Sequence, residues 1–407
     1  MSPPDALAAW LREGKVAETG AGAPPVAVVS AADARRVWKR VAAAVAEQRP
    51  LALTDPVDDA RRAELAAVLA RAEAKTAGAV WMATGGTTGG ARFCRHSGQT
   101  LGTAARGFAA AFPEVREQWS ALPAHHAGGL MPLLRAAVCG GTAVAADYRV
   151  WLGGDFPQMP GPGACLSLVP TQLGRLMAVP AADAFLRAFA MILTGGAALP
   201  PAMQAEAVRR SLPLAPCYGM TETAAMVTVL PPTEFLAGTE GCGRALPHAR
   251  VEADGDGSLS VDTAALFDGY LDLGGFHPRL PGPWATPDAA HWSAEGSLVV
   301  EGRLDRVINT GGKKVSAERV ERVLSGLEGV GAVFVFGAAD PLWGERVIAA
   351  VETENAAAET VWRAFARDRL APEERPKMWL TLKRLPRSSM GKVDMAALRK
   401  SFSLPGK

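Results

Sequence analysis

The segment Thr84-Gly85-Gly86-Thr87-Thr88-Gly89-Gly90-Ala91-Arg92 directly follows the apolar run Ala79-Val80-Trp81-Met82-Ala83. The run predicts a buried strand, and the glycines and threonines after it predict a flexible loop rich in hydrogen-bond donors. Glycine lets backbone N–H groups turn toward an anion, and Arg92 adds positive charge. The segment therefore predicts a phosphate-binding loop, although it is neither a Walker A loop nor a Rossmann fingerprint. A Gly/Thr-rich loop is also a common plain turn, so the choice between the two depends on the rest of the chain.

Short apolar runs alternate with amphipathic stretches through the first 220 residues or so. Strands are predicted at 79–83, 142–146, 165–169, 189–193 and 213–217, with helices at 97–111, 128–139, 171–178 and 201–211. This alternation predicts an α/β domain with largely parallel strands, in which ligands bind at the carboxyl ends of the strands. Segments 84–92, 194–198 and 218–222 each follow a predicted strand directly.

The pattern changes near residue 241, where short strand-like pieces at 249–253, 258–262 and 297–301 predict a small β subdomain. Segment 274–287 is rich in glycine and proline and predicts a long loop. After Arg303 a compact α+β pattern follows, with helices near 316–325 and 358–370 and strands near 331–337, 346–352 and 378–384. We therefore predict a large domain at 1–303 and a small α+β domain at 304–407.

Composition narrows the class of protein. The chain has 407 residues, 49% of them hydrophobic, and a formal net charge of +2, which gives no reason to expect nucleic-acid or membrane partners. No apolar run reaches the ~18 residues that span a bilayer. The five cysteines include no CxxC pair, which fits a reducing cytoplasm, and the histidines show no metal-ligand spacing.

Further segments have the residue types that nucleotide chemistry needs. In Cys217-Tyr218-Gly219-Met220-Thr221-Glu222-Thr223 a ring can stack on a base, a hydroxyl can contact phosphate and a carboxylate can hold Mg²⁺. A helix cap would explain Thr221 equally well. Asp288 and Arg303 can bind sugar hydroxyls, or form an ordinary surface salt bridge. Segments 310–315 (Thr-Gly-Gly-Lys-Lys-Val) and 386–392 (Pro-Arg-Ser-Ser-Met-Gly-Lys) each contain glycine next to lysine.

In this order and spacing, the segments between 79 and 400 resemble the adenylate-forming superfamily of acyl-CoA synthetases, peptide-synthetase adenylation domains and luciferases. The resemblance implies an ATP- and Mg²⁺-dependent enzyme. The carboxylate of an acid attacks the α-phosphate with release of pyrophosphate, and a thiol, such as that of CoA, then displaces AMP. Lysine, loop donors and Mg²⁺ reduce the repulsion between the two anions.

The resemblance also implies residue roles. The ATP phosphates would be bound by Thr84, Gly86, Thr87, Thr88, Gly89 and Arg92, and the adenine site would be lined by Gly196, Ala197, Tyr218 and Gly219. Thr221 would contact the α-phosphate, Glu222 would hold Mg²⁺, and Asp288 and Arg303 would bind the ribose. Lys392 would bridge the carboxylate and the phosphate, Asp305 would be the interdomain hinge, and the Gly311–Gly312 loop would replace Lys392 for the thiol step.

The chain departs from the family pattern in several places. Ala91-Arg92 stands where relatives have proline and lysine, and Gly85 stands in place of a serine. Arginine keeps the charge and adds donors, so phosphate binding is expected to survive. The Thr-Gly-Asp motif that is usual in the family reads Thr286-Pro287-Asp288 in this chain, with proline in place of glycine. The phosphate loop also lies closer to the start than in relatives, so we expect a shortened N-terminal part.

A narrower resemblance is to the menaquinone-pathway branch that ligates 2-succinylbenzoate to CoA. It rests on 122–130 (Leu-Pro-Ala-His-His-Ala-Gly-Gly-Leu), Arg135 and 167–173 (Ser-Leu-Val-Pro-Thr-Gln-Leu). That substrate is a dicarboxylate, and Arg135, Thr171 and Gln172 are candidates to hold its second carboxylate. His126 is a candidate to line the acyl pocket.

Three alternatives stay open at this stage. The acid can be another aromatic or short carboxylic acid, the acceptor can be a carrier protein instead of CoA, and the chain can be a nucleotide-binding homologue that lacks turnover. A homodimer is compatible with the resemblance, but the sequence does not determine the oligomeric state.

Overall fold

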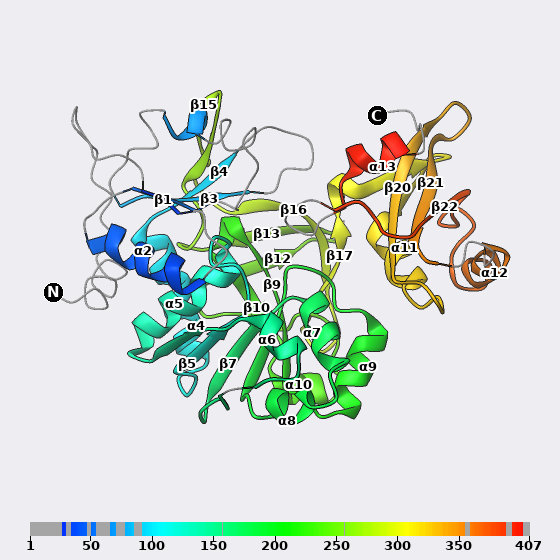
Figure 1. Cartoon of the computed structure of the whole chain (residues 1–407). Coiled ribbons are helices and arrows are strands. Elements are labelled where there is room, and N and C mark those ends of the chain that lie inside the picture. Colours follow the sequence, from blue (N-terminus) through cyan, green and yellow to red (C-terminus); the bar gives the residue numbers. More distant parts are fainter. Residues whose placement is uncertain are drawn as a thin grey trace.

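The computed structural model describes residues 27–29, 34–46, 50–53, 66–70, 78–84, 92–156, 158–255, 257–354, 359–387 and 393–401. The described strands form four sheets. Three lie in the larger part of the molecule, and the fourth, with the C-terminal helices, forms a separate lobe beside it (Figure 1). The fold is therefore mixed α/β, with a large N-terminal part and a small C-terminal part, as the sequence predicts.

A seven-stranded sheet forms the centre of the large part. Its order is β11 (Arg244–Ala245), β10 (Ala225–Val229), β9 (Leu214–Met220), β8 (Met191–Thr194), β7 (Ala164–Leu168), β5 (Glu117–Ser120) and β6 (Thr142–Ala145). Strands β9, β8, β7, β5 and β6 are parallel, which confirms the predicted α/β pattern. Strand β9 is longer than predicted, because it continues through Tyr218 to Met220. The segment 218–222 therefore begins inside a strand and does not follow one.

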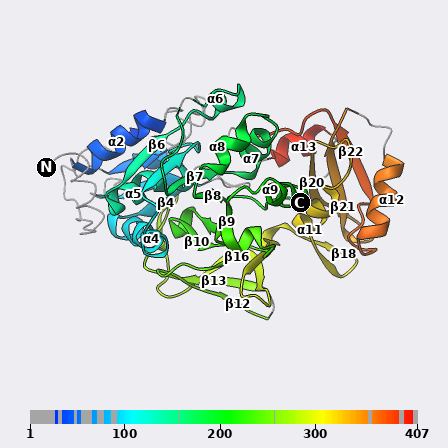
Figure 2. The same ribbon diagram turned by 90° about the horizontal axis from the view of Figure 1, so that it is seen from below.

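Helices cover both faces of this sheet (Figure 2). On one face lie α4 (Gly98–Ala111) and α5 (Ala127–Cys139); on the other lie α6 (Tyr148–Leu152), α7 (Pro170–Met177), α8 (Ala182–Arg187), α9 (Pro201–Arg209) and α10 (Pro232–Leu236). Helix α4 begins at Ser97, whose side chain accepts from the N–H of Thr100, and α5 ends at Gly140 with φ of 63°. Local capping thus sets the ends of the two helices that lie between the sheets.

A six-stranded sheet packs on the outer side of α4 and α5. Its order is β1 (Ala27–Val29), β2 (Leu51–Leu53), β3 (Val80–Ala83), β4 (Phe93–His96), β14 (Gly269–Asp272) and β15 (Gly275–Pro278), and α2 (Ala34–Ala46) packs against the same core. Strands β3 and β4 are antiparallel, with Ala83 opposite Phe93. Segment 84–92 therefore connects two neighbouring antiparallel strands of this sheet, whereas 194–198 follows β8 of the seven-stranded sheet.

The prediction of a long loop at 274–287 is wrong. Strand β15 occupies Gly275–Pro278, and β16 (Trp284–Trp292) begins within the same segment. Glycine and proline obscured the strand because both are rare inside sheets, yet β15 is an edge strand, where proline leaves no ladder bond unmade. Strands β1, β2, β4, β5, β10, β11 and β14 of the large part were also not predicted from the sequence.

A four-stranded antiparallel sheet follows, in the order β12 (Arg250–Ala253), β13 (Ser258–Asp262), β16 and β17 (Leu298–Arg303). The register of β16 and β17 places Asp288 opposite Arg303. The predicted β subdomain is therefore present, and it brings two of the predicted site residues together.

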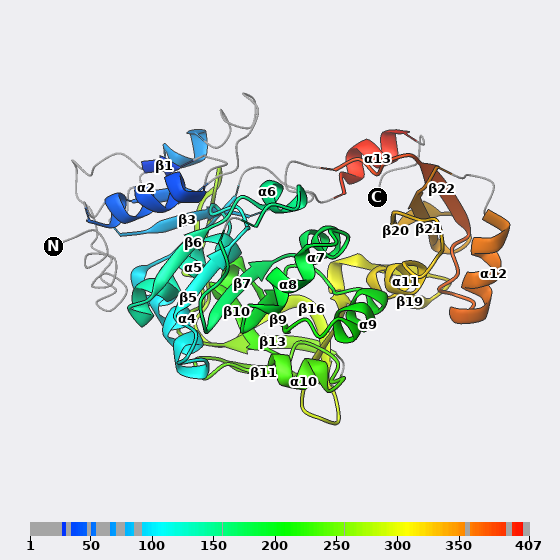
Figure 3. The same cartoon turned by 60° about the horizontal axis from the view of Figure 1, so that its bottom comes forward.

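The C-terminal lobe begins where a short 3-10 turn, η3 (Leu304–Arg306), leaves β17. Its sheet comprises β19 (Lys313–Ser316), β18 (Val307–Thr310), β21 (Gly344–Glu352), β20 (Ala332–Asp340) and β22 (Met378–Leu382). Helices α11 (Ala317–Leu324) and α12 (Glu359–Arg369) pack on one face and α13 (Met395–Ser401) on the other (Figure 3). The chain changes sheets at η3, but a boundary after 303 and a hinge at Asp305 remain predictions.

A strained turn follows β9. The 3-10 turn η2 (Thr221–Thr223) is followed by Ala224 and Ala225 with φ of 53° and 78°, in the left-handed region that non-glycine residues rarely adopt. Strain of this kind persists only where the surroundings hold it, and it clusters at functional sites. Strand β10 then returns so closely that a Cβ on Gly219 would overlap the carbonyl oxygen of Ala225.

This contact predicts that Gly219→Ala lowers the free energy of unfolding by about 1–3 kcal/mol, the usual effect of overpacking. Gly255→Ala is the matched control, because an added Cβ there meets no atom within 4 Å. Urea denaturation measures both. Equal midpoints for the two variants would show that β10 does not press on Gly219.

Candidate functional site

The ends of the predicted phosphate loop are bound to each other. The N–H of Thr84 donates to the carbonyl of Arg92 at 3.0 Å, and Arg92 Nε donates to Thr84 Oγ1 at 3.4 Å. The loop therefore leaves and re-enters the sheet at one point. Residues 85–91 lie outside the described residues, and the predictions for Gly86, Thr87, Thr88 and Gly89 lie there with them.

The predicted base- and ribose-binding residues lie close together. Tyr218 donates its hydroxyl to Asp288 Oδ2 at 2.7 Å, which joins the parallel sheet to the four-stranded sheet. Burial raises the pKa of Tyr218, and the Asp288 carboxylate adds to that effect. Burial also raises the pKa of Asp288, against the lowering effects of Tyr218 and Arg303. One hydroxyl thus holds a mostly buried carboxylate in a fixed orientation.

The predicted hinge residue forms an ion pair with the predicted ribose ligand. Arg303 Nε and Nη2 donate to the two carboxylate oxygens of Asp305 at 2.8 and 2.6 Å. This pairing lowers the pKa of Asp305 and raises that of Arg303. Both side chains are about half exposed, so the pair adds little stability.

The predicted metal ligand, Glu222, accepts a hydrogen bond at 2.6 Å from the hydroxyl of Tyr270 on β14. The Arg92 guanidinium lies over the same tyrosine ring, 4.0 Å from its centre. Burial raises the pKa of Tyr270, with the Glu222 carboxylate as the next cause. One tyrosine therefore contacts both the cation at the end of the phosphate loop and the candidate metal ligand.

The turn that holds Thr221 and Glu222 is also anchored from β4. His96 is fully buried, and its Nε2 donates to the carbonyl of Thr221 at 2.7 Å. A carbonyl can only accept, so Nε2 holds the proton. Burial lowers the pKa of His96 to about 4, against the raising effect of this bond, which makes the ring neutral near pH 7.

Gly196 and Ala197 follow β8 and are exposed, beside the end of the parallel sheet. Gly196 has φ of 78°, a left-handed conformation that suits glycine. The preceding Gly195 is also needed for packing, because an added Cβ would lie 2.8 Å from the Cys217 sulfur. The predicted adenine-lining segment thus lies next to β9, which holds Tyr218.

Arg135 is buried without a carboxylate partner among the described residues. Its Nη2 donates to Ser167 Oγ on β7 at 3.3 Å, and its guanidinium lies 4.5 Å from the centre of the Phe108 ring. Nε has no hydrogen-bond partner in the described structure. Burial lowers the pKa of Arg135, because nothing acidic offsets the loss of hydration.

Arg135 also lies next to the nucleotide segment. Its Nη1 is 3.9 Å from the sulfur of Met226, and Met226 is paired with Gly219 across β10 and β9. The buried guanidinium of Arg135 therefore contacts β10, the strand that pairs with β9 and its predicted base-stacking residue, Tyr218. A charge in this position is costly unless an anion joins it.

The other predicted acyl-site residues have different surroundings. His126 is half-buried at the start of α5, and its ring packs on His125 with 4.3 Å between ring centres. Gln172 accepts from the N–H of Val169 and donates to the carbonyl of Ala121, so both ends of its amide bind backbone. Thr171 is exposed in the first turn of α7. Roles in substrate binding remain predictions for all three.

Gly311 and Gly312 form the two-residue turn between β18 and β19, with φ of 56° and 76°. Successive positive φ values are typical of such hairpin turns and explain both glycines. Gly311 donates its N–H to the carbonyl of Trp343, within the same lobe. Lys392 lies outside the described residues; Arg387 and Val393, on either side of the undescribed stretch, form an antiparallel β-bridge.

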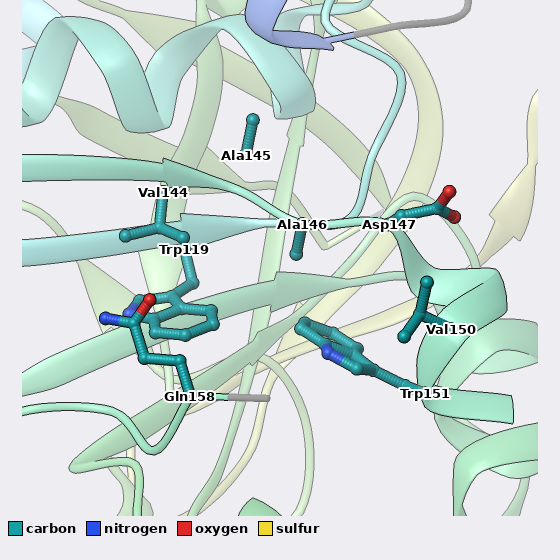
Figure 4. A pocket seen from close by; sticks show the side chains of 8 residues that line it. All are labelled: Trp119, Val144, Ala145, Ala146, Asp147, Val150, Trp151 and Gln158. Carbon is teal, nitrogen blue, oxygen red and sulfur yellow. The ribbon is translucent and has the colours of Figure 1, made fainter. Parts of the chain in front are cut away.

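A separate pocket opens on the face of the parallel sheet that α6–α10 cover, away from α4 and α5 (Figure 4). It is lined by side chains from β5, β6 and α6 and the following loop: Trp119, Val144, Ala145, Ala146, Asp147, Val150, Trp151 and Gln158. Its volume of about 190 Å³ is below the range of typical ligand pockets. No predicted site residue lines it.

Sequence reasoning missed Tyr270, His96 and Ser167. The chain has only three tyrosines, and two of them donate to the two candidate carboxylates. That scarcity was the available signal for Tyr270. His96 gave no signal, and Ser167 was noted only as part of segment 167–173, because contact with their partners, the carbonyl of Thr221 and the side chain of Arg135, arises only on folding.

The described residues contain no group of three or more His, Cys, Asp or Glu side chains that could hold a metal. Within the same residues, no helix is long and apolar enough to cross a membrane. Mg²⁺ is commonly held by one or two carboxylates together with substrate phosphates, so the single carboxylate of Glu222 suits it.

A model of AMP-binding enzymes matches residues 21–271, which is more than half of the chain, and a model of the AMP-binding enzyme C-terminal domain matches residues 319–392. The chain belongs to the AMP-binding enzyme family. This confirms the predicted adenylate-forming superfamily.

Similar proteins include the 2-succinylbenzoate–CoA ligase of Listeria monocytogenes, 27% identical over 71% of this chain and 62% of that protein. The probable 2-succinylbenzoate–CoA ligase of Mycobacterium tuberculosis is 30% identical over 70% of this chain and 74% of its own. The indoleacetate–CoA ligase of Aromatoleum aromaticum is 30% identical over 67% and 56%. The chain thus spans less than two thirds of the length of the first and third of these relatives.

Solved structures share the fold. The o-succinylbenzoate–CoA synthetase of Bacillus subtilis, in complex with its acyl-adenylate intermediate, matches with a TM-score of 0.78 at 20% identity, over 98% of this chain and 92% of that one. The amide bond synthetase of Marinactinospora thermotolerans matches with 0.74 at 22% identity, over 98% and 93%. Both matches include the C-terminal lobe.

The buried His96 predicts acid sensitivity. Its pKa is about 4 in the folded protein and near 6.5 in the unfolded chain, so only the unfolded chain gains a proton between these values. The free energy of unfolding should therefore fall by up to about 3 kcal/mol as the pH drops from about 6.5 to 4. Below pH 4 the contribution of His96 should not change further.

Urea denaturation at about pH 7 and pH 4.5 measures this loss. His96→Gln keeps a donor for Thr221 but cannot titrate, so the variant should lose less stability than the wild type on acidification. His248, whose pKa burial also lowers to about 4, contributes equally to both proteins. An unchanged pH dependence in His96→Gln would contradict the assignment.

Proposed function

We propose that the protein is an ATP-dependent, AMP-forming acid–CoA ligase whose acid is a dicarboxylate of the 2-succinylbenzoate class, as used in menaquinone biosynthesis. The observation that supports this acid is the buried Arg135 guanidinium, which has no carboxylate partner among the described residues. The family and the arrangement of Tyr218, Glu222 and Asp288 support the ATP chemistry.

In the first step, an oxygen of one substrate carboxylate attacks the α-phosphorus of ATP, and pyrophosphate leaves. Tyr218 would stack on the adenine, and Asp288 and Arg303 would bind the ribose hydroxyls. Ribose binding would draw Arg303 away from Asp305, its present partner. Thr84 and Arg92 would bind the phosphates that leave, since they lie at the closed base of the loop.

Glu222 is the residue that would hold Mg²⁺, and Thr221 beside it in the sequence would contact the α-phosphate. The metal supplies positive charge that offsets the charge of the phosphates. His96 and Tyr270 fix the turn and the carboxylate before any ligand arrives, so little reorganisation is needed when ATP binds.

In the second step, the CoA sulfur attacks the acyl carbon and AMP leaves with the bond electrons. We propose that the C-terminal lobe turns about Asp305, which removes Lys392 from the acid and brings the Gly311–Gly312 turn to the site. The lobe contacts the large part near that point, where Arg322 of α11 donates to the carbonyl of Val300 on β17 at 3.1 Å.

A second candidate is a ligase for an aromatic monocarboxylic acid, which the similarity to the indoleacetate–CoA ligase supports. Such an acid has no second carboxylate for Arg135. The two candidates therefore differ in what removal of this arginine does to substrate preference. A homodimer and a cytoplasmic location remain predictions under either candidate.

Substitution of Arg135 tests whether the substrate is a dicarboxylic acid. Arg135→Met should raise KM for 2-succinylbenzoate at least tenfold, about 1.4 kcal/mol, while KM for a monocarboxylate such as benzoate or indoleacetate changes little. Because no acidic partner offsets the buried charge, the same variant should keep or gain stability to urea.

Arg106→Met on the exposed side of α4 is the matched control for both measurements. CoA thioester formation with ATP and Mg²⁺ gives the KM values. Unchanged KM for the dicarboxylate together with a large loss of stability would mean that Arg135 serves the fold alone.

Lys392→Ala tests whether Lys392 acts in adenylate formation alone and not in the transfer to CoA. Pyrophosphate release should fall at least 100-fold, because a charge that bridges two anions is lost. Transfer from a preformed acyl-adenylate to CoA should stay within a few-fold of wild type. Lys383→Ala, at an exposed lysine of the same lobe, is the control. Equal losses in both half-reactions would refute the role.

A further inference from the structure

Tyr270 lies where the two charged groups of the nucleotide site meet. Its hydroxyl donates to Glu222 Oε1 at 2.6 Å, and the Arg92 guanidinium lies 4.0 Å from the centre of its ring. Glu222 comes from the turn after β9, whereas Arg92 closes the β3–β4 hairpin. These two groups belong to different sheets, and Tyr270 contacts both.

The tyrosine ring is held from several sides. Phe267 packs against it with 4.6 Å between ring centres, and the N–H of Phe267 donates to the carbonyl of Glu222 at 2.9 Å. Its strand, β14, pairs with β4, and Tyr270 lies opposite Cys94 in this pairing. Cys94 is two residues after Arg92 in the sequence. The Arg95–Asp268 ion pair at 3.1 Å adds a further link between these strands.

The two contacts of Tyr270 have different chemistry. A hydroxyl that donates to one oxygen of a carboxylate leaves the other oxygen available and sets the direction in which it points. A guanidinium over an aromatic face is held by the ring's quadrupole and keeps its five N–H donors for other partners. Neither contact uses the group's capacity to bind a metal or a phosphate.

We propose that Tyr270 is a positioning residue that couples the metal-binding carboxylate to the phosphate loop: its hydroxyl orients Glu222 toward Mg²⁺, and its ring places Arg92 toward the phosphates. The inference rests on the proposed function, since it takes ATP and Mg²⁺ as the ligands. Hydrogen-bonded partners of metal ligands typically contribute 10–100-fold to metal affinity.

Binding measurements separate the two contacts without turnover. The affinity of a non-hydrolysable ATP analogue is measured by calorimetry with Mg²⁺ and with EDTA, and the ratio of the two gives the gain due to metal. Tyr270→Phe keeps the ring and removes the hydroxyl, so this gain should fall about tenfold while the affinity in EDTA stays unchanged. Tyr270→Leu should also weaken binding in EDTA, because Arg92 loses its support.

Tyr148→Phe removes a different tyrosine hydroxyl, one that donates to the carbonyl of Gln172, and should alter neither affinity. In a Glu222→Gln background, Tyr270→Phe should have no further effect on the gain due to metal, because its partner is already lost. A full effect in that background would overturn the inference, as would equal weakening with Mg²⁺ and with EDTA.

The outcomes also separate this inference from the proposed function. If the wild-type protein binds the analogue more tightly with Mg²⁺ and Tyr270→Phe retains the whole gain, the role of Tyr270 is refuted and the ligase proposal stands. If the wild-type protein binds no ATP analogue under either condition, the ligase proposal fails, and the role of Tyr270 fails with it.

Discussion

The turn after β9 is the point at which three sheets are joined. Tyr218, on the last part of the strand, donates to Asp288 of the four-stranded sheet. Thr221 and Glu222, on the turn itself, accept from His96 and Tyr270 of the six-stranded sheet. These three hydrogen bonds hold in place a backbone that includes two strained alanines. The geometry of the predicted nucleotide site therefore depends on how the sheets pack, since no local preference would produce this turn.

Two kinds of preorganisation are present, and they differ in their effect on stability. Around Glu222 and Asp288, each carboxylate accepts a hydrogen bond from a tyrosine hydroxyl, which replaces part of its lost hydration. Around Arg135, the guanidinium has one serine, one thioether and an aromatic face, but no anion. An uncompensated buried cation costs stability, and a site that awaits an anionic ligand is a physical reason for its retention.

Sequence reasoning succeeded where local chemistry defines the structure. Four of the five parallel strands, β6, β7, β8 and β9, and helices α4, α5, α7 and α9 were predicted to within a few residues, because hydrophobic periodicity and capping are local signals. It failed at 274–287, where glycine and proline obscured an edge strand whose partner, β14, is itself short. It correctly placed the phosphate loop directly after a strand, since β3 ends at Ala83 and is parallel to β2, but it did not predict the antiparallel strand β4 that follows the loop.

The sequence by itself determined the family, the order of the nucleotide motifs and the presence of a cation, Arg135, in the segment that precedes β6. These follow from residue identity and spacing, which folding does not alter. Only the tertiary structure decided that Arg135 has no acidic partner, that Arg303 pairs with Asp305, and that Tyr270 lies between Arg92 and Glu222. The surroundings of Arg135 depend on α4, β7 and β10 meeting in space, and the contacts of Tyr270 depend on elements from different sheets. Burial and pairing of charge are properties of that meeting, and residue spacing does not encode them.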